Sequence, residues 1–359
     1  MKSPRNSPDS SFSKDDNPII AESSSRMYPV PTPHPDFWLY DGSIVLSVES
    51  CLFRVHQTIL ANHSEIFSDL FTLPQPAEDA EEMIEGCRIV HLPDSESDFV
   101  DLLNAIYRPE CVSLNLLTLP SSDCFPIIFI IFHLASYFDS LSTDADLETV
   151  LTFIEGILRL STKYIIRYLR QRCISLFLTK FPSTLDGYTL KAGALNREKY
   201  KSDNVMRAIN LARQNNVLEI LPYAFYCIAR LPHKRILKDR PIDISWKDKT
   251  VSLIGRERLQ WAQTSLSHVF LLNFQRAPLC QSSLCAFARG PHSEWHILDC
   301  MKSPNPLHAY DNWDSLNVCS DCVAYCKIRH LKGREEVWDR LPDLFELPTW
   351  DELRNAQNM

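Results

Sequence analysis

From residue 44 onward the chain has the two-residue period of a short strand with one buried face, since Ile44, Leu46 and Val48 alternate with Val45, Ser47 and Glu49. Ile44, Leu46 and Val48 form the apolar row, and we expect this row to face a core. The polar pair at 49–50 predicts a turn, and residues 53–55 resume the alternation as the returning arm of a hairpin. The segment therefore predicts two paired strands.

A helical period replaces the alternation from His56 onward. One face collects the apolar side chains of Ile59, Leu60, Ile66, Phe67, Leu70 and Phe71. Ser64 interrupts this face and can cap a new first turn, so the pattern predicts two short helices.

Residues 89–92 predict a third strand, and a helix follows it. The apolar residues of this helix recur with the spacing i, i+3, i+4, i+7, at Phe99, Leu102, Leu103 and Ile106. The predicted order is strand, strand, helix, helix, strand, helix, which indicates an α+β domain.

The helical pattern returns at Asp146 and continues to Pro182, which ends it. Two apolar stripes follow one another there, the first over 150–158 and the second over 164–177. Residues 205–212 and 218–231 predict further helices, and Pro222 can occupy the first turn of the second of these. We expect the first pair to complete the α+β domain and the others to form an all-α extension.

The sequence of this region resembles the BTB/POZ domain, in the form found in many paralogous BTB proteins of mushroom-type fungi. The matching phrases are HPDFW, DGSIVLSVE, FRVH, S..F.DLF.LPQP, EGC.IVHL.DS and, later, LRLSTKY...YLR. Many BTB domains carry a second acid two residues after the position of Asp41, where this chain has Ser43. The resemblance implies a protein-interaction domain without catalysis that usually self-associates and in some cases links a target to a cullin-type ubiquitin ligase.

The chain divides into four predicted parts. They are a disordered leader at 1–35, a BTB/POZ domain at 36–181, a helical extension at 182–275 and an irregular cysteine-containing region at 276–359. Residues 111–136 depart from the resembled pattern as an apolar insertion with one charged residue, Asp123. Its apolar core is shorter than the roughly 20 residues of a membrane span. It is either a genuine insertion that packs on a partner or on the domain's own helices, or a translated intron.

We expect residues 36–71 to carry the self-association face, because the hairpin and the helix pair leave more apolar surface than a small monomer exposes. The candidate contacts are Phe37, Trp38, Val45, His56, Phe67 and Phe71. The alternative is that the extension or the insertion covers this surface within one chain. His56 stands at a strand–helix junction, where a structural role is the ordinary interpretation.

Composition limits the functions that the chain can have. A net charge of −8 and a pI near 5.8 argue against a nucleic-acid groove, which needs clustered positive charge. With eight glycines there is neither a phosphate-binding loop nor a dinucleotide fingerprint, and no catalytic motif stands in a suitable context. Residues 1–26 lack the apolar segment of a secretory signal. We therefore expect a cytoplasmic or nuclear protein that is not an enzyme, has no small-molecule substrate and does not enter a membrane.

Twelve cysteines in a reducing compartment favour metal binding or burial over disulfides. The metal-like spacing is C-x4-C followed by C-x2-C, at Cys280, Cys285, Cys319 and Cys322. Two such pairs on short loops can surround zinc with four thiolates in a tetrahedron. The alternative is that these side chains are small buried apolar groups, since free cysteine is among the most buried residue types.

The aromatic residues near the end of the chain, Trp338, Phe345 and Trp350, predict docking on the chain's own domain, with an anchor for a partner's groove as the alternative. For the whole protein we expect an adaptor or scaffold that binds itself and other proteins. A zinc-containing transcriptional regulator is the second candidate, because BTB domains are often attached to zinc fingers, although the acidic balance and the lack of repeated C2H2 units argue against it.

Overall fold

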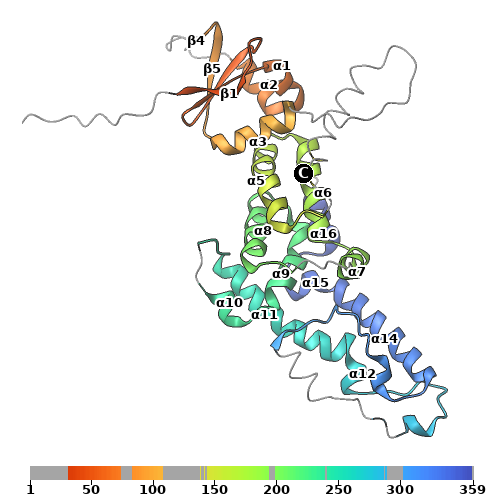
Figure 1. Ribbon diagram of the computed structural model, residues 1–359. Coiled ribbons are helices and arrows are strands. Elements are labelled where there is room, and N and C mark those ends of the chain that lie inside the picture. Colours follow the sequence, from red (N-terminus) through yellow and green to blue (C-terminus); the bar gives the residue numbers. More distant parts are fainter. Residues whose placement is uncertain are drawn as a thin grey trace, which may run out of the picture.

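The computed structural model describes residues 31–73, 83–107, 138, 141, 144–193, 199–238, 241–286, 288 and 302–357. A small sheet with three covering helices lies at one end of an elongated molecule, helices α5 to α11 form the middle, and α12 and α14 lie at the other end (Figure 1). The predicted insertion at 111–136 and most of the predicted leader lie outside the described residues. Within the described ranges, none of the helices has the length and apolar character needed to cross a bilayer.

The sheet has the strand order β1-β3-β2-β5-β4. Its strands are β1 Thr32–Trp38, β2 Ile44–Val48, β3 Cys51–Val55, β4 Met83–Ile84 and β5 Cys87–Leu92. β2 and β3 pair antiparallel, and Glu49 takes a positive φ of 51° in the turn between them. This confirms the predicted hairpin. β2 also pairs with β5 in parallel, which places two interior strands side by side.

Two features of the sheet differ from the sequence prediction. Every residue of β2 is buried, so the prediction of one exposed face was wrong. The second face is buried because Val45 packs in a separate small cluster with Leu52 and Cys87. β1 starts at Thr32, inside the segment expected to be disordered, and pairs in parallel with β3. Pro33 and Pro35 fit there because a proline that cannot donate to a ladder is tolerated in an edge strand.

Helices α1 Gln57–His63, α2 Glu65–Thr72 and α3 Glu96–Tyr107 confirm the three predicted helices of this domain. The break between α1 and α2 is the predicted one: the Ser64 hydroxyl oxygen accepts from the backbone amide of Phe67 at 3.0 Å. The same hydroxyl donates to the carbonyl of Tyr164, a hundred residues further along the chain. Phe67 stacks on the Tyr164 ring with centroids 4.2 Å apart, which joins the helix pair to the later helices.

The helical part of the chain starts with α5 Leu147–Lys163 and α6 Arg167–Lys180, which coincide with the two predicted stripes. The extension then continues with α7 Leu185–Gly193, α8 Ser202–Gln214, α9 Leu221–Ala229, α10 His233–Leu237, α11 Trp246–Ala262, the π-helical turn η2 Gln263–Ser267 and α12 Val269–Leu272. Pro222 lies in the first turn of α9, as predicted. Most of these helices bury one face in a core that is continuous with that of the sheet.

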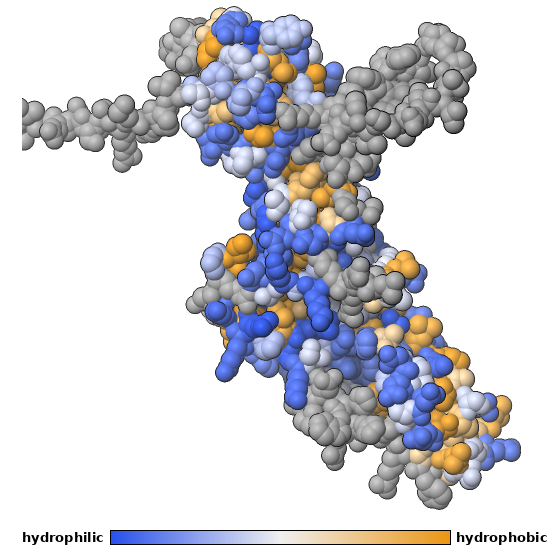
Figure 2. Space-filling view, in the orientation of Figure 1, coloured by the Kyte–Doolittle hydropathy of each residue, from blue (hydrophilic) through white to orange (hydrophobic). Residues whose placement is uncertain are grey.

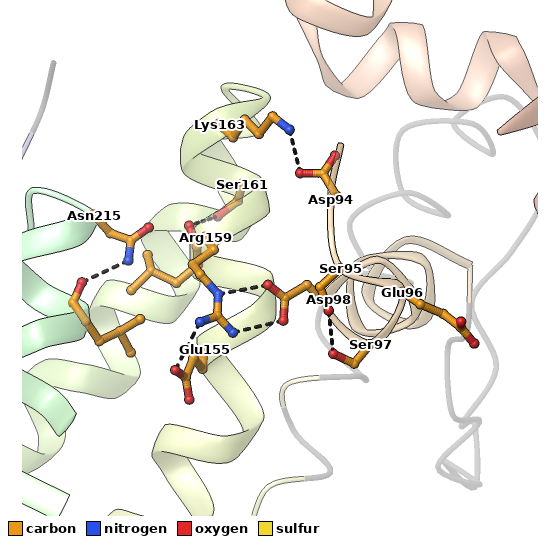
Figure 3. A network of polar contacts seen from close by, with 12 residues as sticks. Asp94, Ser95, Glu96, Ser97, Asp98, Glu155, Arg159, Ser161, Lys163 and Asn215 are labelled. Carbon is orange, nitrogen blue, oxygen red and sulfur yellow. Dashed lines mark hydrogen bonds and ion pairs between the residues drawn. The ribbon is translucent and has the colours of Figure 1, made fainter. Parts of the chain in front are cut away.

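A polar network fixes α5 against α3 (Figure 3). Arg159 of α5 donates from two nitrogens to the two carboxylate oxygens of Asp98 on α3, at 2.8 and 2.9 Å. Glu155 accepts from Arg159 at 3.1 Å and also pairs with Arg207 of α8. The two helices approach closely at Gly156, where an added Cβ would lie 3.0 Å from the Cα of Asp98. Three helices are thereby held at one junction.

The C-terminal region is more helical than the sequence indicated. It contains η3 Ser283–Cys285, η4 Trp313–Leu316, α14 Ser320–Asp339, α15 Leu341–Leu344 and α16 Trp350–Ala356. The predicted docking of the aromatic end on its own domain is confirmed, because Trp338, Phe345 and Trp350 are buried and the two tryptophans stack with centroids 5.5 Å apart. The C-terminus returns to the vicinity of α6 (Figure 1).

Candidate metal centre and interaction surface

The four predicted cysteines converge at the far end of the molecule. Cys280 lies in the loop after α12, and Cys285 ends the short turn η3. Cys319 is the N-cap of α14, and Cys322 lies in its first turn. Their sulfur atoms all lie within 4.8 Å of one another. Cys285 and Cys319 are 34 residues apart in the sequence, and the packing of α14 on the preceding segment brings the two cysteine pairs together.

The packing of α14 that brings the cysteine pairs together is tight. Gly333 of α14 lies against η2, where an added Cβ would be 2.3 Å from the carbonyl oxygen of Leu266. Phe270, Leu271, Leu316 and Cys326 form a small buried cluster beside the four thiols. Because this cluster is separate from the main core, the end of the molecule has little apolar burial of its own to hold it together.

The geometry fits a zinc site. Four sulfur atoms that surround zinc at about 2.3 Å lie roughly 3.8 Å apart, and Cys280 and Cys319 have sulfurs 3.6 Å apart. That separation is well beyond a disulfide bond of about 2.05 Å, and all four cysteines are free. Backbone amides of Ala277 and Cys319 donate to two of the sulfurs at 3.3 and 3.2 Å, as thiolate ligands require from their surroundings.

The charges of the thiols also fit a bound cation. Burial raises the pKa of the Cys280 thiol, but the backbone amide of Ser282 and two neighbouring thiols outweigh burial and lower it to about 6. Burial, together with hydrogen bonds to the other thiols, raises the pKa of Cys322 to about 12. One thiolate therefore forms readily, and further negative charge at this place needs a positive ion to balance it.

From the sequence alone, Cys326 could not be excluded as a fifth candidate metal ligand. It follows Cys322 by one helical turn, yet its side chain is buried in the apolar cluster, and it does not belong to the group of four converging sulfurs. Burial raises the pKa of its thiol. Spacing alone predicts the two pairs, but only the orientation of α14 separates the four candidate ligands from Cys326.

Most of the predicted interaction-surface residues lie inside the chain. Phe37, Val45, Phe67 and Phe71 have exposed fractions of 2, 0, 0 and 7%. Phe37 and the two helical phenylalanines belong to the main core, and Val45 belongs to the second cluster of the sheet. The prediction that these four side chains form exposed contacts was wrong for this conformation, because β1, α3 and the later helices cover them.

Trp38 and His56 keep partial exposure and lie where β1 and β3 end. The His56 imidazole stacks on the Tyr107 ring and lies 3.2 Å from a carboxylate oxygen of Asp41. The hydrogen bond from His56 lowers the pKa of the Asp41 carboxyl. Sequence reasoning missed Tyr40, which is 89% exposed in the same turn; an aromatic residue just before Asp-Gly was the available signal. These residues form what we call the β1-end surface: Trp38, Tyr40, Asp41 and His56.

Ser43 occupies the position where many BTB domains have a second acid. Its hydroxyl oxygen accepts from the first backbone amide of α1, that of Gln57, at 3.0 Å. A serine can satisfy an unpaired amide at a helix start as well as a carboxylate does. The departure from the resembled pattern therefore keeps the local structure and removes one negative charge from this end of the domain.

Apolar side chains are mixed with polar ones over much of the surface in view, and several gather near α14 (Figure 2). There Ile328 and Leu331 of α14 are 63 and 50% exposed, and Leu279 and Leu284 beside the cysteines are 92 and 72% exposed. Exposed apolar side chains thus lie on the end of the molecule that carries the candidate metal centre.

Comparison with known proteins identifies one domain. Residues 43–122 match the BTB/POZ domain family. The match begins just before β2 and covers β3 to β5 and α1 to α3. No curated protein and no solved structure matches the chain. The chain thus contains a BTB/POZ domain of short strands and helices, which is a protein-interaction domain, followed by a mostly helical region with a cysteine cluster near its end.

Proposed function

We propose that this protein is a non-enzymatic adaptor whose BTB/POZ domain self-associates and whose helical remainder presents a second binding surface. The observation that carries the proposal is the BTB/POZ match over a folded sheet-and-helix domain, since domains of this family bind proteins. The elongated arrangement supports it, because the sheet domain and the end formed by α12 and α14 are far enough apart to contact different partners (Figure 1). We place its action in the cytoplasm or the nucleus.

Self-association would use the β1-end surface. Among the described strands β1 lies at an edge of the sheet, and an edge strand can pair with another chain. Tyr40 and Trp38 offer aromatic area beside it, and both are residue types that dominate interface energies. A two-fold contact would let this one surface serve both partners.

Zinc at the four cysteines would be structural. All four positions around the metal would be filled by thiolates, which leaves no open position for a substrate or water. The metal would fasten the loop after α12 to the start of α14 and so hold the apolar end in shape. Chemistry at the metal is not part of this function.

As a more specific role, we propose that the protein is a substrate receptor for a cullin-type ubiquitin ligase. We also propose that it belongs with the BTB proteins of mushroom-type fungi that its sequence resembles. The test is capture of the tagged full chain from its native cell, with the partners identified by mass spectrometry. We expect a cullin subunit and a client protein among the captured proteins. Partners without any cullin would leave an adaptor outside the ubiquitin system.

A zinc-containing transcriptional regulator is the second candidate, and the converging cysteines are the observation that favours it. The same capture separates the two proposals if crosslinked DNA is sequenced in parallel. Enrichment of particular promoter sequences would select the regulator, whereas an adaptor recovers DNA no better than an untagged control.

A further inference from the structure

A basic recess lies in the helical extension, away from both the β1-end surface and the cysteines. It has a volume of about 430 Å³ and lies between α7, α9 and the segment at Ser303. Lys191, Lys199 and Arg230 line it, and its described lining residues include no aspartate or glutamate. Three cations around one recess in a chain of net charge −8 are an unusual local concentration of positive charge.

Tyr200 fixes one of these cations in place. The Lys191 ammonium donates to the Tyr200 hydroxyl and lies 4.6 Å from the centre of its ring. That hydroxyl in turn donates to the carbonyl of Lys180 at 2.7 Å. The tyrosine hydroxyl thus accepts from the ammonium while it gives its own proton to the carbonyl, and this pair of hydrogen bonds fixes Lys191 beside the recess.

Arg230 is the second fixed cation, and it is half-buried. Its guanidinium carbon lies 5.4 Å from the centre of the Tyr226 ring, and its Nε is buried without a hydrogen-bond partner. In the described part of the chain, no carboxylate pairs with Arg230 or with Lys199. A desolvated cation without a counter-charge is costly, and an anion in the recess would remove that cost.

From this arrangement we propose that the recess binds a small phosphomonoester. Lys191, Lys199 and Arg230 supply the donors for a phosphate dianion, and arginine is well suited to phosphate because its planar fork can donate twice. Tyr200 and Tyr223 line the same recess and give it aromatic surface beside the cations. The volume is within the usual range for small-molecule pockets of roughly 300–1,000 Å³, whereas an extended peptide needs an open groove.

Calorimetric titration of the full chain with phenyl phosphate tests the proposal, with inorganic phosphate and phenol titrated in parallel. We expect saturable binding of phenyl phosphate, weaker binding of inorganic phosphate and none of phenol. Arg230→Gln should weaken the binding at least about tenfold, because it removes the fork. Lys199→Glu is the second variant, since its exposed side chain can be changed without disturbing the fold. Lys332→Gln, which removes an exposed charge on α14, is the matched control and should bind like the wild type.

Three results would overturn the proposal. The first is the absence of saturable binding of either phosphate probe at millimolar concentration. The second is binding that both recess variants leave unchanged, which would move the site elsewhere. The third is binding of a phosphotyrosine peptide by a protein that does not bind phenyl phosphate, which would assign the recess to peptide recognition.

Discussion

Val45 lies on the second face of strand β2, which the sequence pattern predicted to be exposed. Its side chain is fully buried against Leu52 and Cys87, in a cluster separate from the main core. We predict that Val45→Asp lowers the free energy of unfolding by roughly 3 kcal/mol or more, because a carboxylate there has neither water nor a partner. Urea denaturation followed by circular dichroism measures this change.

The matched control for that substitution is Leu190→Asp, which introduces the same charge at a 78% exposed apolar side chain on α7. An exposed substitution should change stability by no more than about 0.5 kcal/mol. If both variants were equally stable, the second apolar cluster of the sheet would contribute nothing to the fold.

Asp101 gives the junction between α3 and α5 a dependence on pH. Burial and the neighbouring Asp98 raise the pKa of its carboxyl from 3.8 to about 6, against the effect of Arg159. The folded state therefore holds a proton that the unfolded state has lost between about pH 4 and pH 6, so stability falls as pH rises through this window.

Asp101→Asn should remove that loss. We expect the variant to be more stable than the wild type at pH 7 by roughly 1 kcal/mol, a value reduced from the full pKa shift because the Asp101 side chain is only partly buried. Denaturation at pH 4, 5, 6 and 7 gives the two profiles, and Asp69→Asn on the exposed side of α2 is the control. Parallel profiles for wild type and Asp101→Asn would show that this carboxyl is not the cause.

At the scale of elements, Gly156 allows α5 to lie against α3. An added Cβ would meet a carboxylate oxygen of Asp101 at 2.8 Å and the Cα of Asp98 at 3.0 Å. Gly156→Ala should therefore destabilise the protein by about 1–3 kcal/mol, although alanine alone favours a helix by about 1 kcal/mol over glycine. Gly193→Ala in α7 is the control, because nothing lies within 4 Å of the added atom. A thermal melt in which both variants gain stability would contradict this account of the junction.

A bound metal would hold the start of α14 against the loop that follows α12. If the four thiols bind zinc, purified protein holds about one zinc per chain by elemental analysis, and Cys319→Ser or Cys322→Ser loses it while Cys227→Ser keeps it. Removing the metal with a chelator should raise hydrogen exchange over residues 270–285 and 310–326 and leave the strands of the sheet protected. Metal-free protein with full protection in those segments would support the alternative of small buried side chains.

The sequence predicted elements well where the pattern is local. The helices α3, α5 and α6 and the hairpin β2–β3 follow from apolar periodicity, and Ser64 caps α2 as expected. The edge strand β1 was missed because prolines suppress strand patterns, and its pairing with β3 depends on the rest of the sheet. The interaction surface was misassigned for a similar reason, since Phe67 is buried by Tyr164, a contact that no local pattern contains.

At the scale of the whole molecule, a candidate site could be predicted from the sequence only where its residues are close together in the chain. The cysteine pairs were found by spacing, but the loop and the helix that carry them meet only through the long-range packing of Gly333 on η2. The basic recess has no sequence motif at all, because Lys191, Lys199 and Arg230 come from separate segments. Charge patterns of this kind become visible only after the helices of the extension are placed.

Self-association is the property of the whole molecule that the remaining exposed residues of the BTB/POZ domain predict. We expect the full chain to sediment as a dimer at micromolar concentration, and Tyr40→Asp to shift it toward monomer, because a charge at the centre of an apolar contact is costly to desolvate. Leu190→Asp is the matched control, since it places the same charge at a 78% exposed apolar side chain on α7, away from β1. A dimer should also melt at a temperature that rises with protein concentration, and this dependence should be weaker for Tyr40→Asp. A wild-type chain that stays monomeric with native circular dichroism would remove self-association from the function, and a dimer that Tyr40→Asp leaves intact would move its interface away from the end of β1.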